Sequence, residues 1–221
     1  ATRSQYASRL QLLLVADEIV TDSESAARDV ARMLDISPDR LTSLGAGVSP
    51  DFTPRTTPLA DRLPQLQRAI PDLRAGFILA PSGMDWRKNV EGAMEAYAAL
   101  PSTLRRRHQL VIACRQTDSE AREVDSARAR LGIADDEVVA TGYVSDPDLV
   151  ALYQSAHLVF FPSYYEGFGL PVLEARRCGA RVICSNTSSL PEVLPDQGAL
   201  FNPYDRAEMS AMLFAALTDE Q

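Results

Sequence analysis

Long apolar runs, histidine, paired cysteines and a surplus of positive charge are all missing or scarce in this sequence of 221 residues. No stretch approaches the roughly 20 apolar residues that a membrane-spanning helix needs. The first residues also lack the apolar core of a signal peptide. We therefore expect a soluble chain of cytoplasmic location, and the sequence leaves open whether a full-length protein would associate with a membrane.

Cysteine and histidine are too few and too scattered to suggest a metal site. The three cysteines are Cys114, Cys178 and Cys184, and the two histidines are His108 and His157. An odd number of cysteines without metal-type or C-x-x-C spacing favours reduced thiols in a core over a disulfide framework. The sequence therefore predicts no bound metal ion.

Positive charge is too sparse for nucleic-acid binding. The chain has 22 Lys and Arg against 30 Asp and Glu, which gives a formal net charge of -8 and a pI near 4.8. Proteins that hold a phosphate backbone do so with clustered Lys and Arg. We expect no nucleic-acid partner.

From about Gly76 onward the sequence contains a regular alternation of strand and helix signals. Short β-branched or aromatic runs alternate with longer segments of helical period, the pattern of βαβ units in a parallel sheet. The expected strands are Gly76–Ala80, Gln109–Cys114, Glu137–Thr141, Leu158–Phe161, Arg181–Cys184 and Ala199–Phe201. The expected helices are Asn89–Leu100, Ser119–Leu131, Asp146–Ser155, Leu170–Cys178 and Arg206–Leu217. We predict an α/β fold with a doubly wound, mainly parallel, Rossmann-like sheet.

The first 75 residues have too few strand signals for a sheet of their own. Helical periods cover Tyr6–Ala16 and Ser23–Leu34, and short strand signals occur at Glu18–Thr21 and Leu41–Leu44. Turn-forming residues are dense over Gly45–Pro58. We expect three segments: the tail end of an N-terminal domain whose body lies outside this chain, residues 1–50; an interdomain linker, residues 51–75; and a C-terminal domain, residues 76–221.

The stretch from Phe160 to Ala175 is the most informative part of the sequence. A buried strand ends at Phe161, a loop with Glu166 and two glycines follows, and a helix begins near Leu170. Such a helix start points unpaired N–H groups and a positive dipole end at the space beyond the strands, where an anion such as a diphosphate is stabilised. In open α/β sheets the ligand crevice lies at that edge. The pattern therefore predicts an anion-binding crevice.

Two carboxylates and two cations are placed to complete such a crevice. Glu166 and Glu174 are separated by seven residues, so both can face it, and carboxylates accept hydrogen bonds from adjacent hydroxyls of ribose and hexose rings. Arg87 and Lys88 follow the first strand of the sheet in a second loop, which contains Gly83. Their charges would offset a diphosphate held beside the two glutamates.

These residues resemble motifs of the retaining GT-B glycosyltransferases of the group 1 type. The run from Glu166 to Glu174 is similar to the E-x7-E motif of that family. Ser82–Asn89 is similar to its G-G-x-D-x-R-K-N phosphate loop, with Ser82 in place of the first glycine. Thr141–Ser145 resembles the turn that contacts the nucleotide base, and Ser188–Glu192 resembles the S-L-P-E turn behind the site.

The resemblance covers nearly the whole chain. Ala16–Glu24 is similar to the end of the family's N-terminal domain. Ala113–Arg115 departs from the family, because many members have a glycine-rich strand end there. The resemblance therefore implies the C-terminal, donor-binding domain of a GT-B fold.

The resemblance also implies an activity and a role for each matching residue. The activity is transfer of a hexose from a nucleotide diphosphate sugar to an acceptor, with retention of anomeric configuration and without an essential metal or other cofactor. Lys88, with Arg87, would stabilise the diphosphate leaving group, Glu174 would hold the ribose hydroxyls, and Glu166 would hold the hydroxyls of the donor sugar. The other expected donor contacts are Gly83, Gly167, Phe168, Gly169 and Leu170 around the phosphates and sugar, and Tyr143 and Val144 beside the base.

Other functions remain open at this point. A GT-B epimerase or phosphorylase and a noncatalytic nucleotide-sugar-binding module would share the fold. Within the leading hypothesis, the D-x-R-K-N loop favours a GDP-sugar as donor. A saccharide or lipid-linked acceptor would be bound by the missing N-terminal domain, so we expect this chain alone to bind donor and to transfer no sugar.

Overall fold

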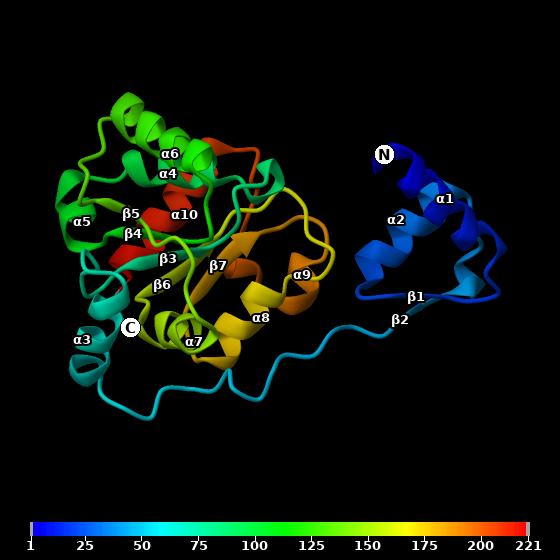
Figure 1. Ribbon diagram of the computed structural model, residues 1–221, viewed down its shortest axis with the longest axis horizontal. Helices are drawn as coiled ribbons and strands as arrows, with labels where there is room; N and C mark the ends of the chain where they lie inside the picture. Colours follow the sequence, from blue (N-terminus) through cyan, green and yellow to red (C-terminus); the bar gives the residue numbers. More distant parts are fainter. Residues whose placement is uncertain (1, 220–221) are drawn as a thin grey trace. The chain divides into compact units, whose positions relative to one another are not determined.

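The computed structural model describes residues 2–219, with side chains from Arg9 onward. The chain forms two compact units, one ending at Gly47 and the other beginning at Val48 (Figure 1). Ala1 and Gln221, the outer ends of the expected segments 1–50 and 76–221, lie outside the described residues.

The first unit contains a parallel strand–helix–strand arrangement after a helix. Its elements are α1 (Thr2–Val15), β1 (Ile19–Thr21), α2 (Glu24–Leu34), η1 (Pro38–Arg40) and β2 (Leu41–Ser43). β1 and β2 pair in parallel. Ser23 caps α2 by accepting a hydrogen bond from the backbone N–H of Ala26 at 3.0 Å, as serine does at helix starts. The order of elements matches the one expected from the sequence.

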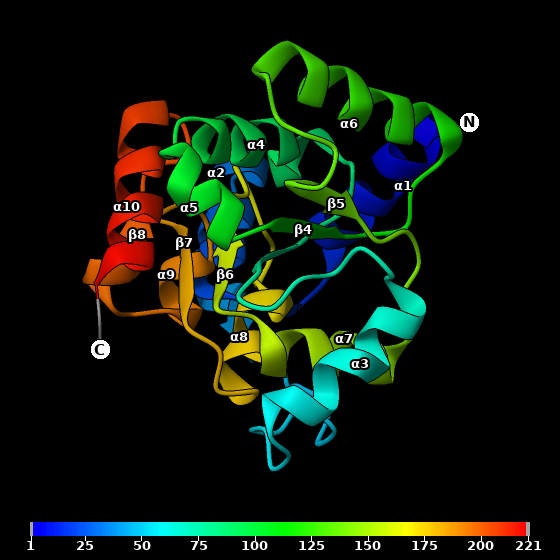
Figure 2. The same ribbon diagram turned by 90° about the vertical axis from the view of Figure 1, so that its left-hand side faces the viewer.

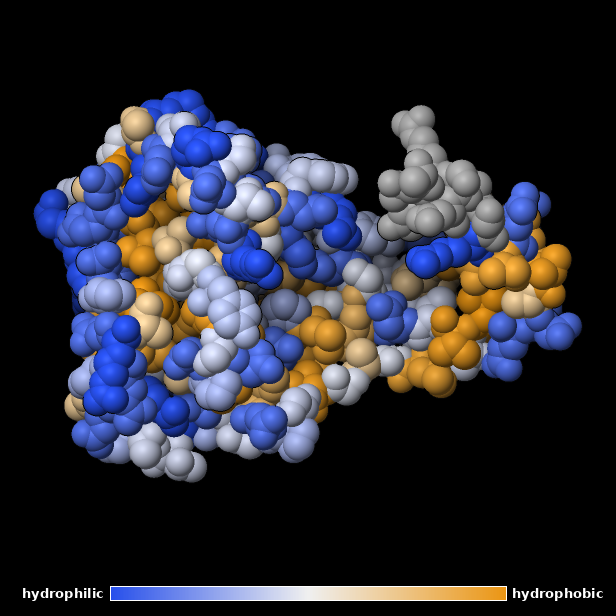
Figure 3. Space-filling model, in the orientation of Figure 1, coloured by the Kyte–Doolittle hydropathy of each residue, from blue (hydrophilic) through white to orange (hydrophobic). Residues whose placement is uncertain are grey.

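Several large apolar side chains of the first unit are exposed. Figure 3 shows apolar residues on the surface of this unit. The most exposed of them, between 57% and 78% accessible, are Leu12, Val15, Val20, Met33 and Leu44. Contiguous apolar surface of this kind marks an interaction face more often than a solvated one. The unit therefore has apolar surface that its own elements do not cover.

The second unit is built on one six-stranded sheet (Figure 1). Its strands are β3 (Ile78–Pro81), β4 (Leu110–Ala113), β5 (Val138–Ala140), β6 (Leu158–Phe161), β7 (Val182–Ser185) and β8 (Leu200–Phe201). They lie in the order β5-β4-β3-β6-β7-β8, and every neighbouring pair is parallel. The chain therefore adds strands in one direction from β3 and then in the other from β6, which confirms the doubly wound parallel sheet.

Helices cover both faces of this sheet (Figure 2). One face carries α4 (Val90–Ala98), α5 (Ser102–Arg107), α6 (Asp118–Leu131) and α10 (Arg206–Thr218). The other carries α3 (Leu59–Ala69), α7 (Asp146–Ser155), α8 (Leu170–Arg177) and α9 (Leu190–Val193). Strand side chains alternate between the two cores: Ile78 packs in the first and Leu79 in the second. Strands buried on both faces explain why the sequence shows continuous apolar runs there.

Helix ends lie close to the expected positions because capping residues define them. α7 has the expected bounds, and Ser145 caps it. α6 begins with a capping box, in which Thr117 accepts from the backbone N–H of Glu120 and Glu120 accepts from that of Thr117. The helix ends at Gly132 in the left-handed conformation. Within residues 2–219, no helix combines the length and apolarity needed to cross a bilayer.

The segment 51–75, expected to be a linker, contains helix α3, which the sequence analysis did not predict. Leu66 lies in this helix, Ile70 and Leu73 follow it, and all three are buried in the second core. Proline precedes the helix at Pro58 and lies within its first two turns at Pro64. Prolines of this density indicate a loop. Pro64 lies inside the helix and lacks the N–H for one backbone hydrogen bond, and burial of Leu66 and Leu73 offsets that loss.

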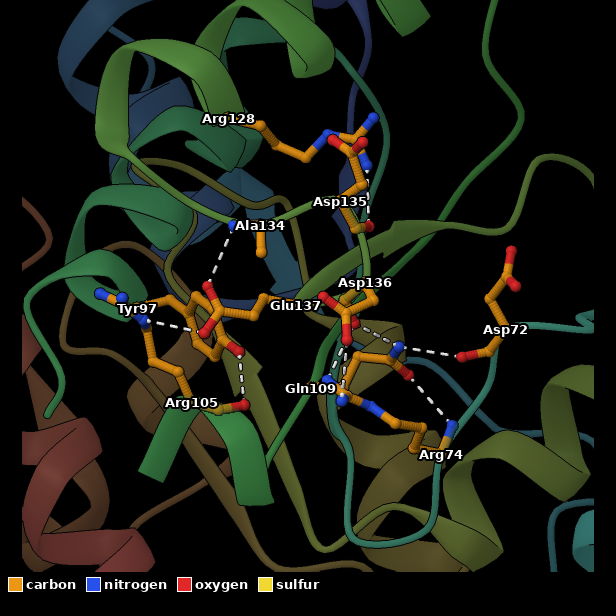
Figure 4. Close-up of polar contacts among 10 residues, drawn as sticks. All are labelled: Asp72, Arg74, Tyr97, Arg105, Gln109, Arg128, Ala134, Asp135, Asp136 and Glu137. Carbon is orange, nitrogen blue, oxygen red and sulfur yellow. Dashed lines mark hydrogen bonds and ion pairs between the residues drawn. The ribbon is translucent and has the colours of Figure 1, made fainter. Parts of the chain in front are cut away.

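A hydrogen-bond network closes the amino edge of the sheet (Figure 4). The side-chain amide of Gln109 donates to the carbonyl oxygens of Asp72 at 2.9 Å and Asp136 at 2.8 Å. Beside it, the guanidinium of Arg105 lies 3.3 Å from the carboxylate of Glu137. These contacts fix the chain where it enters β3, β4 and β5. Ligand binding is therefore expected at the opposite, carboxyl edge.

Two histidines lie in contact at this amino edge. The rings of His108 and His157 are 4.7 Å apart, and Nδ1 of His108 lies 2.8 Å from the carbonyl oxygen of Gly76. Burial lowers the pKa of His108, the hydrogen bond with Gly76 opposes this effect, and the charge of Arg107 lowers the pKa further. Burial also lowers the pKa of His157. The charge of protonated His108 and the charge of Arg181 lower it further. Both rings are therefore neutral in the folded protein at neutral pH.

We predict that the free energy of unfolding falls as the pH drops below about 6.5, the ordinary pKa of histidine. The folded-state pKa values lie below that of the unfolded chain, so the unfolded chain takes up protons first and is favoured. Urea unfolding curves across this range measure the effect. In His157→Gln the pH dependence should be weaker, and an unchanged dependence would contradict the prediction.

Candidate functional site

The candidate site lies at the carboxyl edge of the sheet, where the strand order reverses. β3 and β6 pair with each other at that point. The loop after β3 carries Arg87 and Lys88, and the loop after β6 carries Glu166. A reversal of this kind opens a crevice between two adjacent loops, which is the usual ligand position in open α/β sheets. The structure therefore brings these predicted residues together.

Lys88 and Glu166 form an ion pair across the two loops. The Nζ atom of Lys88 lies 2.7 Å from Oε1 and 3.0 Å from Oε2 of Glu166. The two side chains are 20% and 10% exposed. Nζ also lies 5.5 Å from the ring centroid of Phe161, the last residue of β6. The sequence predicted both residues at one site but did not predict their direct contact.

The loop after β7 fixes the backbone of Glu166. Its N–H donates to Oγ of Ser188 at 2.9 Å, and its carbonyl oxygen accepts from Oγ of Ser189 at 3.0 Å. Ser188 has a positive φ of 50°, and Ser189 is fully buried. The S-L-P-E turn therefore supports the site directly, by holding the carboxylate-bearing loop.

The loop carrying Lys88 is fixed by Asn89. Asn89 is buried, has a left-handed backbone with φ of 53°, and donates from Nδ2 to the carbonyl oxygen of Pro162 at 3.0 Å. Its Oδ1 accepts from Arg206 at 3.1 Å. A second link joins the loops, because the N–H of Tyr164 donates to the carbonyl oxygen of Arg87 at 2.7 Å. These bonds place Lys88 opposite Glu166.

Arg87 is oriented differently from Lys88. Its Nε lies 2.9 Å from Oδ1 of Asp85, the residue that also caps the short helix η2 (Trp86–Lys88). Hydrogen bonds from Arg87 lower the pKa of Asp85. The side chain of Arg87 is 43% exposed. Arg87 is therefore paired within its own loop, and its role toward a diphosphate stays a prediction.

Glu174 lies in α8 with a partner that the sequence analysis missed. Oε2 of Glu174 accepts a hydrogen bond from the hydroxyl of Tyr153 in α7 at 3.0 Å. Burial raises the pKa of Glu174, and the hydrogen bond from Tyr153 opposes that rise. Burial and the nearby Glu174 carboxylate raise the pKa of Tyr153 well above its usual value, so it stays protonated. Tyr153 therefore orients a half-buried carboxylate.

Gly169 and Gly83 differ in whether the structure requires glycine at that position. Gly169 has a φ of 104°, and an added Cβ would lie 2.8 Å from Leu190 and 3.2 Å from Val193, so backbone and packing both require glycine. At Gly83 an added Cβ would meet nothing within 4 Å. The space in front of Gly83 is open, which leaves room for the close ligand approach predicted from the sequence.

The remaining predicted contacts follow two different strands, β5 and β6. Phe168 packs in the second core, next to the half-buried Gly167, whereas Leu170 is 41% exposed at the start of α8. Tyr143 is 75% exposed after β5, and Val144 packs against the second core. β4 and β3 separate β5 from β6. A ligand that touched both Tyr143 and Glu166 would therefore extend across several strand ends.

One sequence signal for this site was overlooked. Lys88 is the only lysine among the 22 Lys and Arg of the chain. The motif contained Asn89 but not its partner Pro162, which lies 73 residues away, and no pattern pointed to Tyr153, which lies 21 residues from Glu174. Among the residues that the structure describes, no three His, Cys, Asp or Glu gather in a way that could hold a metal ion.

Comparisons with known proteins place this geometry among sugar transferases. A family model described as "Glycosyl transferases group 1" matches residues 68–221. The chain is 36% identical over 220 residues to the serotype-specific mannosyltransferase WbdA of Escherichia coli, covering 99% of this chain and 26% of that protein. It is 35% identical over 202 residues to the O-antigen chain mannosyltransferase B of Escherichia coli, covering 91% and 52%. The chain thus spans a quarter to a half of these relatives.

Solved structures share the fold. WaaG, a glycosyltransferase involved in lipopolysaccharide biosynthesis, superimposes with a TM-score of 0.76 at 21% identity, covering 91% of this chain and 54% of that one. HepE of Anabaena, in complex with UDP and glucose, gives 0.78 at 17% identity, covering 92% and 54%. The likeness confirms the predicted Rossmann-like fold of the GT-B type.

We predict that Tyr153→Phe raises the pKa of Glu174 further, because the hydrogen bond that favours its charged form is lost. Carboxyl-detected NMR titration measures the shift. Tyr97→Phe is a matched control, since Tyr97 is also fully buried and donates one hydrogen bond, to the carbonyl oxygen of Arg105 (Figure 4). Both variants should lose about 1 kcal/mol of stability. Equal pKa values of Glu174 in the two variants would refute the orienting role.

Proposed function

Because the chain belongs to the group 1 glycosyl transferases, we propose that it binds a nucleotide diphosphate hexose at the carboxyl edge of its sheet and supports hexose transfer to an acceptor. The observation that carries the proposal is the Lys88–Glu166 ion pair at the strand reversal. The pair supports the proposal because Lys88 is a cation suited to phosphate and Glu166, in the loop before α8, is a carboxylate suited to sugar hydroxyls.

Lys88 supplies a positive charge that stabilises the diphosphate as it leaves. As the bond between the sugar and the diphosphate breaks, negative charge accumulates on the leaving group. A cation already fixed in a partly dehydrated crevice lowers the barrier without reorganising at that moment. At an effective dielectric near 20, a lysine about 4 Å from a phosphate charge contributes roughly 4 kcal/mol before desolvation. An ammonium has three N–H groups, so Lys88 can contact Glu166 and a phosphate oxygen together.

The two glutamates act on different rings of the donor. Glu174 lies one helix turn into α8, half-buried and oriented by Tyr153, which suits a pair of ribose hydroxyls. Glu166 lies in the loop before the helix and suits the hydroxyls of the hexose. The open space in front of Gly83 and the start of α8 then accommodate the diphosphate between the rings.

The donor we propose is a GDP-linked mannose, and the transfer retains the anomeric configuration. Mannose is supported by the two Escherichia coli mannosyltransferases at 36% and 35% identity. Retention and the GDP base rest on the resemblance of the E-x7-E and D-x-R-K-N segments. Positioning of the acceptor hydroxyl is worth about 7–11 kcal/mol of barrier. The chain covers 26% and 52% of these relatives, and we propose that this positioning belongs to the part of such proteins that it does not cover. The chain alone is proposed to bind donor without transferring sugar.

Replacing Lys88 with alanine should weaken nucleotide diphosphate binding by about 1.5–3 kcal/mol, the value of a hydrogen bond to a charged group. Binding of the matching nucleosides should stay unchanged. Titration calorimetry with GDP, UDP, ADP and dTDP, each beside its nucleoside, measures both. Arg68→Ala, which removes an exposed cation from α3, is the control and should bind like wild type. Equal losses for nucleoside and diphosphate would rule out the phosphate role.

Substitution of the two glutamates should weaken binding of different ligands. Glu174→Gln should weaken binding of the bare nucleotide diphosphate, whereas Glu166→Gln should weaken only the complete sugar donor. Glu166→Gln also releases Lys88 from its ion pair, so affinity for the bare diphosphate should not fall. Calorimetry of both variants against GDP and GDP-mannose tests this. The sugar contact would be wrong if Glu166→Gln reduced affinity for the two ligands equally.

A further inference from the structure

A large cavity lies beside the candidate donor crevice. It has a volume of about 740 Å³ and opens between helices α4 and α6 and the short helix η2. Its apolar lining includes Met84, Val90, Met94 and Val124, the last three of which are buried. A cavity of this size falls in the range of small-molecule and oligosaccharide sites. None of the donor-binding roles assigned above uses it.

Aromatic rings form one end of this cavity. Trp86 and Tyr164 line it, and their ring centroids are 6.4 Å apart. Tyr204 stacks on Tyr164 with centroids 4.9 Å apart. Trp86 is 73% exposed and Tyr204 is 69% exposed, so both rings keep most of their surface accessible despite these contacts. Exposed flat rings offer negatively polarised faces, on which the C–H groups of a sugar ring can pack.

The charges around the cavity balance. Three arginines and three carboxylates line it, and they are Arg122, Arg130, Arg206, Asp85, Glu91 and Glu123. Arg130 pairs with Glu91. A lining without net charge favours neither a polyanion nor a polycation. It does offer many hydrogen-bond donors and acceptors beside apolar surface, which is what a neutral polyhydroxylated ligand requires.

The short helix η2 separates this cavity from the donor crevice. Trp86 at its start lines the cavity, whereas Lys88 at its end contacts Glu166. Arg206 also lines the cavity, where its guanidinium hydrogen-bonds the hydroxyl of Tyr164 and Asn89, the residue after Lys88. A ligand in the cavity would therefore lie next to the donor crevice without occupying it.

We propose that this cavity binds a neutral oligosaccharide, with Trp86 packing against a sugar ring and the arginines and carboxylates bonding its hydroxyls. The ligand's role as the growing chain of the transferase rests on the proposed function, but the binding itself does not. A second site of this kind would keep a saccharide close to the donor between successive transfers.

The chain contains a single tryptophan, and it lines this cavity, so tryptophan emission arises from the cavity lining. Titration with mannotetraose in the absence of nucleotide should change the Trp86 emission in a saturable way. Saturating GDP should leave that titration unchanged within about twofold, because the two ligands occupy separate sites. Mutual exclusion of mannotetraose and GDP would overturn the proposal, since it would place the saccharide in the donor crevice.

Variants locate the site by calorimetry. Trp86→Ala and Arg122→Ala, which act from η2 and α6, should each weaken mannotetraose binding about tenfold, the loss expected for a central contact. Phe214→Ala removes a half-exposed ring of α10 outside the cavity and should bind like wild type. Thermal unfolding of each variant shows whether it is folded.

The outcomes separate this proposal from the proposed function. Mannotetraose binding that depends on Trp86 and Arg122 supports the oligosaccharide site even if no nucleotide binds. Binding that is lost in Lys88→Ala and kept in Arg122→Ala would overturn it. The proposal would also fail if neither mannotetraose nor maltotetraose changed the Trp86 emission at millimolar concentration, or if an amphipathic peptide saturated the cavity in their place.

Discussion

The ion pair between Lys88 and Glu166 is the contact on which the candidate site depends. It joins the loops that follow β3 and β6, the two strands at which the sheet changes its direction of growth. Parallel pairing delivers both loops to one edge, and the buried Asn89 and the serines after β7 hold them there. A site assembled in this way needs no residue from the amino edge, which is closed by its own hydrogen bonds.

Lysine and arginine would behave differently at the contact with Glu166. Every other Lys or Arg position of the chain is arginine, whose planar guanidinium forms fixed, bidentate pairs. Several of these arginines form ion pairs between separate elements, including Arg105 with Glu137 and Arg206 with Glu95. Lys88 instead presents a compact charge with rotatable donors. It can therefore exchange part of its contact with Glu166 for another oxygen without moving the backbone.

Much of this architecture could be predicted from the sequence, because both the strands and the caps leave local signals. The continuous apolar run at Leu158–Phe161 gave a strand with the observed bounds, and Ser145 located the start of α7. Helix α3 was missed because Pro58 and Pro64 indicate a loop, whereas burial of Leu66 stabilises the helix. The motif spacing predicted that Lys88 and Glu166 lie at one site, and the structure brings them into contact, but the prediction assigned them to different parts of the donor. Their pairing, and that of Tyr153 with Glu174, depends on tertiary contacts that no local pattern contains.

The single lysine also bears on how the protein can be handled in the laboratory. Amine-directed reagents normally spread over many surface lysines, so a few modified sites leave most molecules functional. Here Lys88 carries the only side-chain amine, and it belongs to a partly buried ion pair. Coupling through side-chain amines to a sensor surface or a fluorescent dye would therefore modify the crevice itself. Attachment through the buried cysteines would disturb the core, so an added terminal tag is the suitable means of immobilisation.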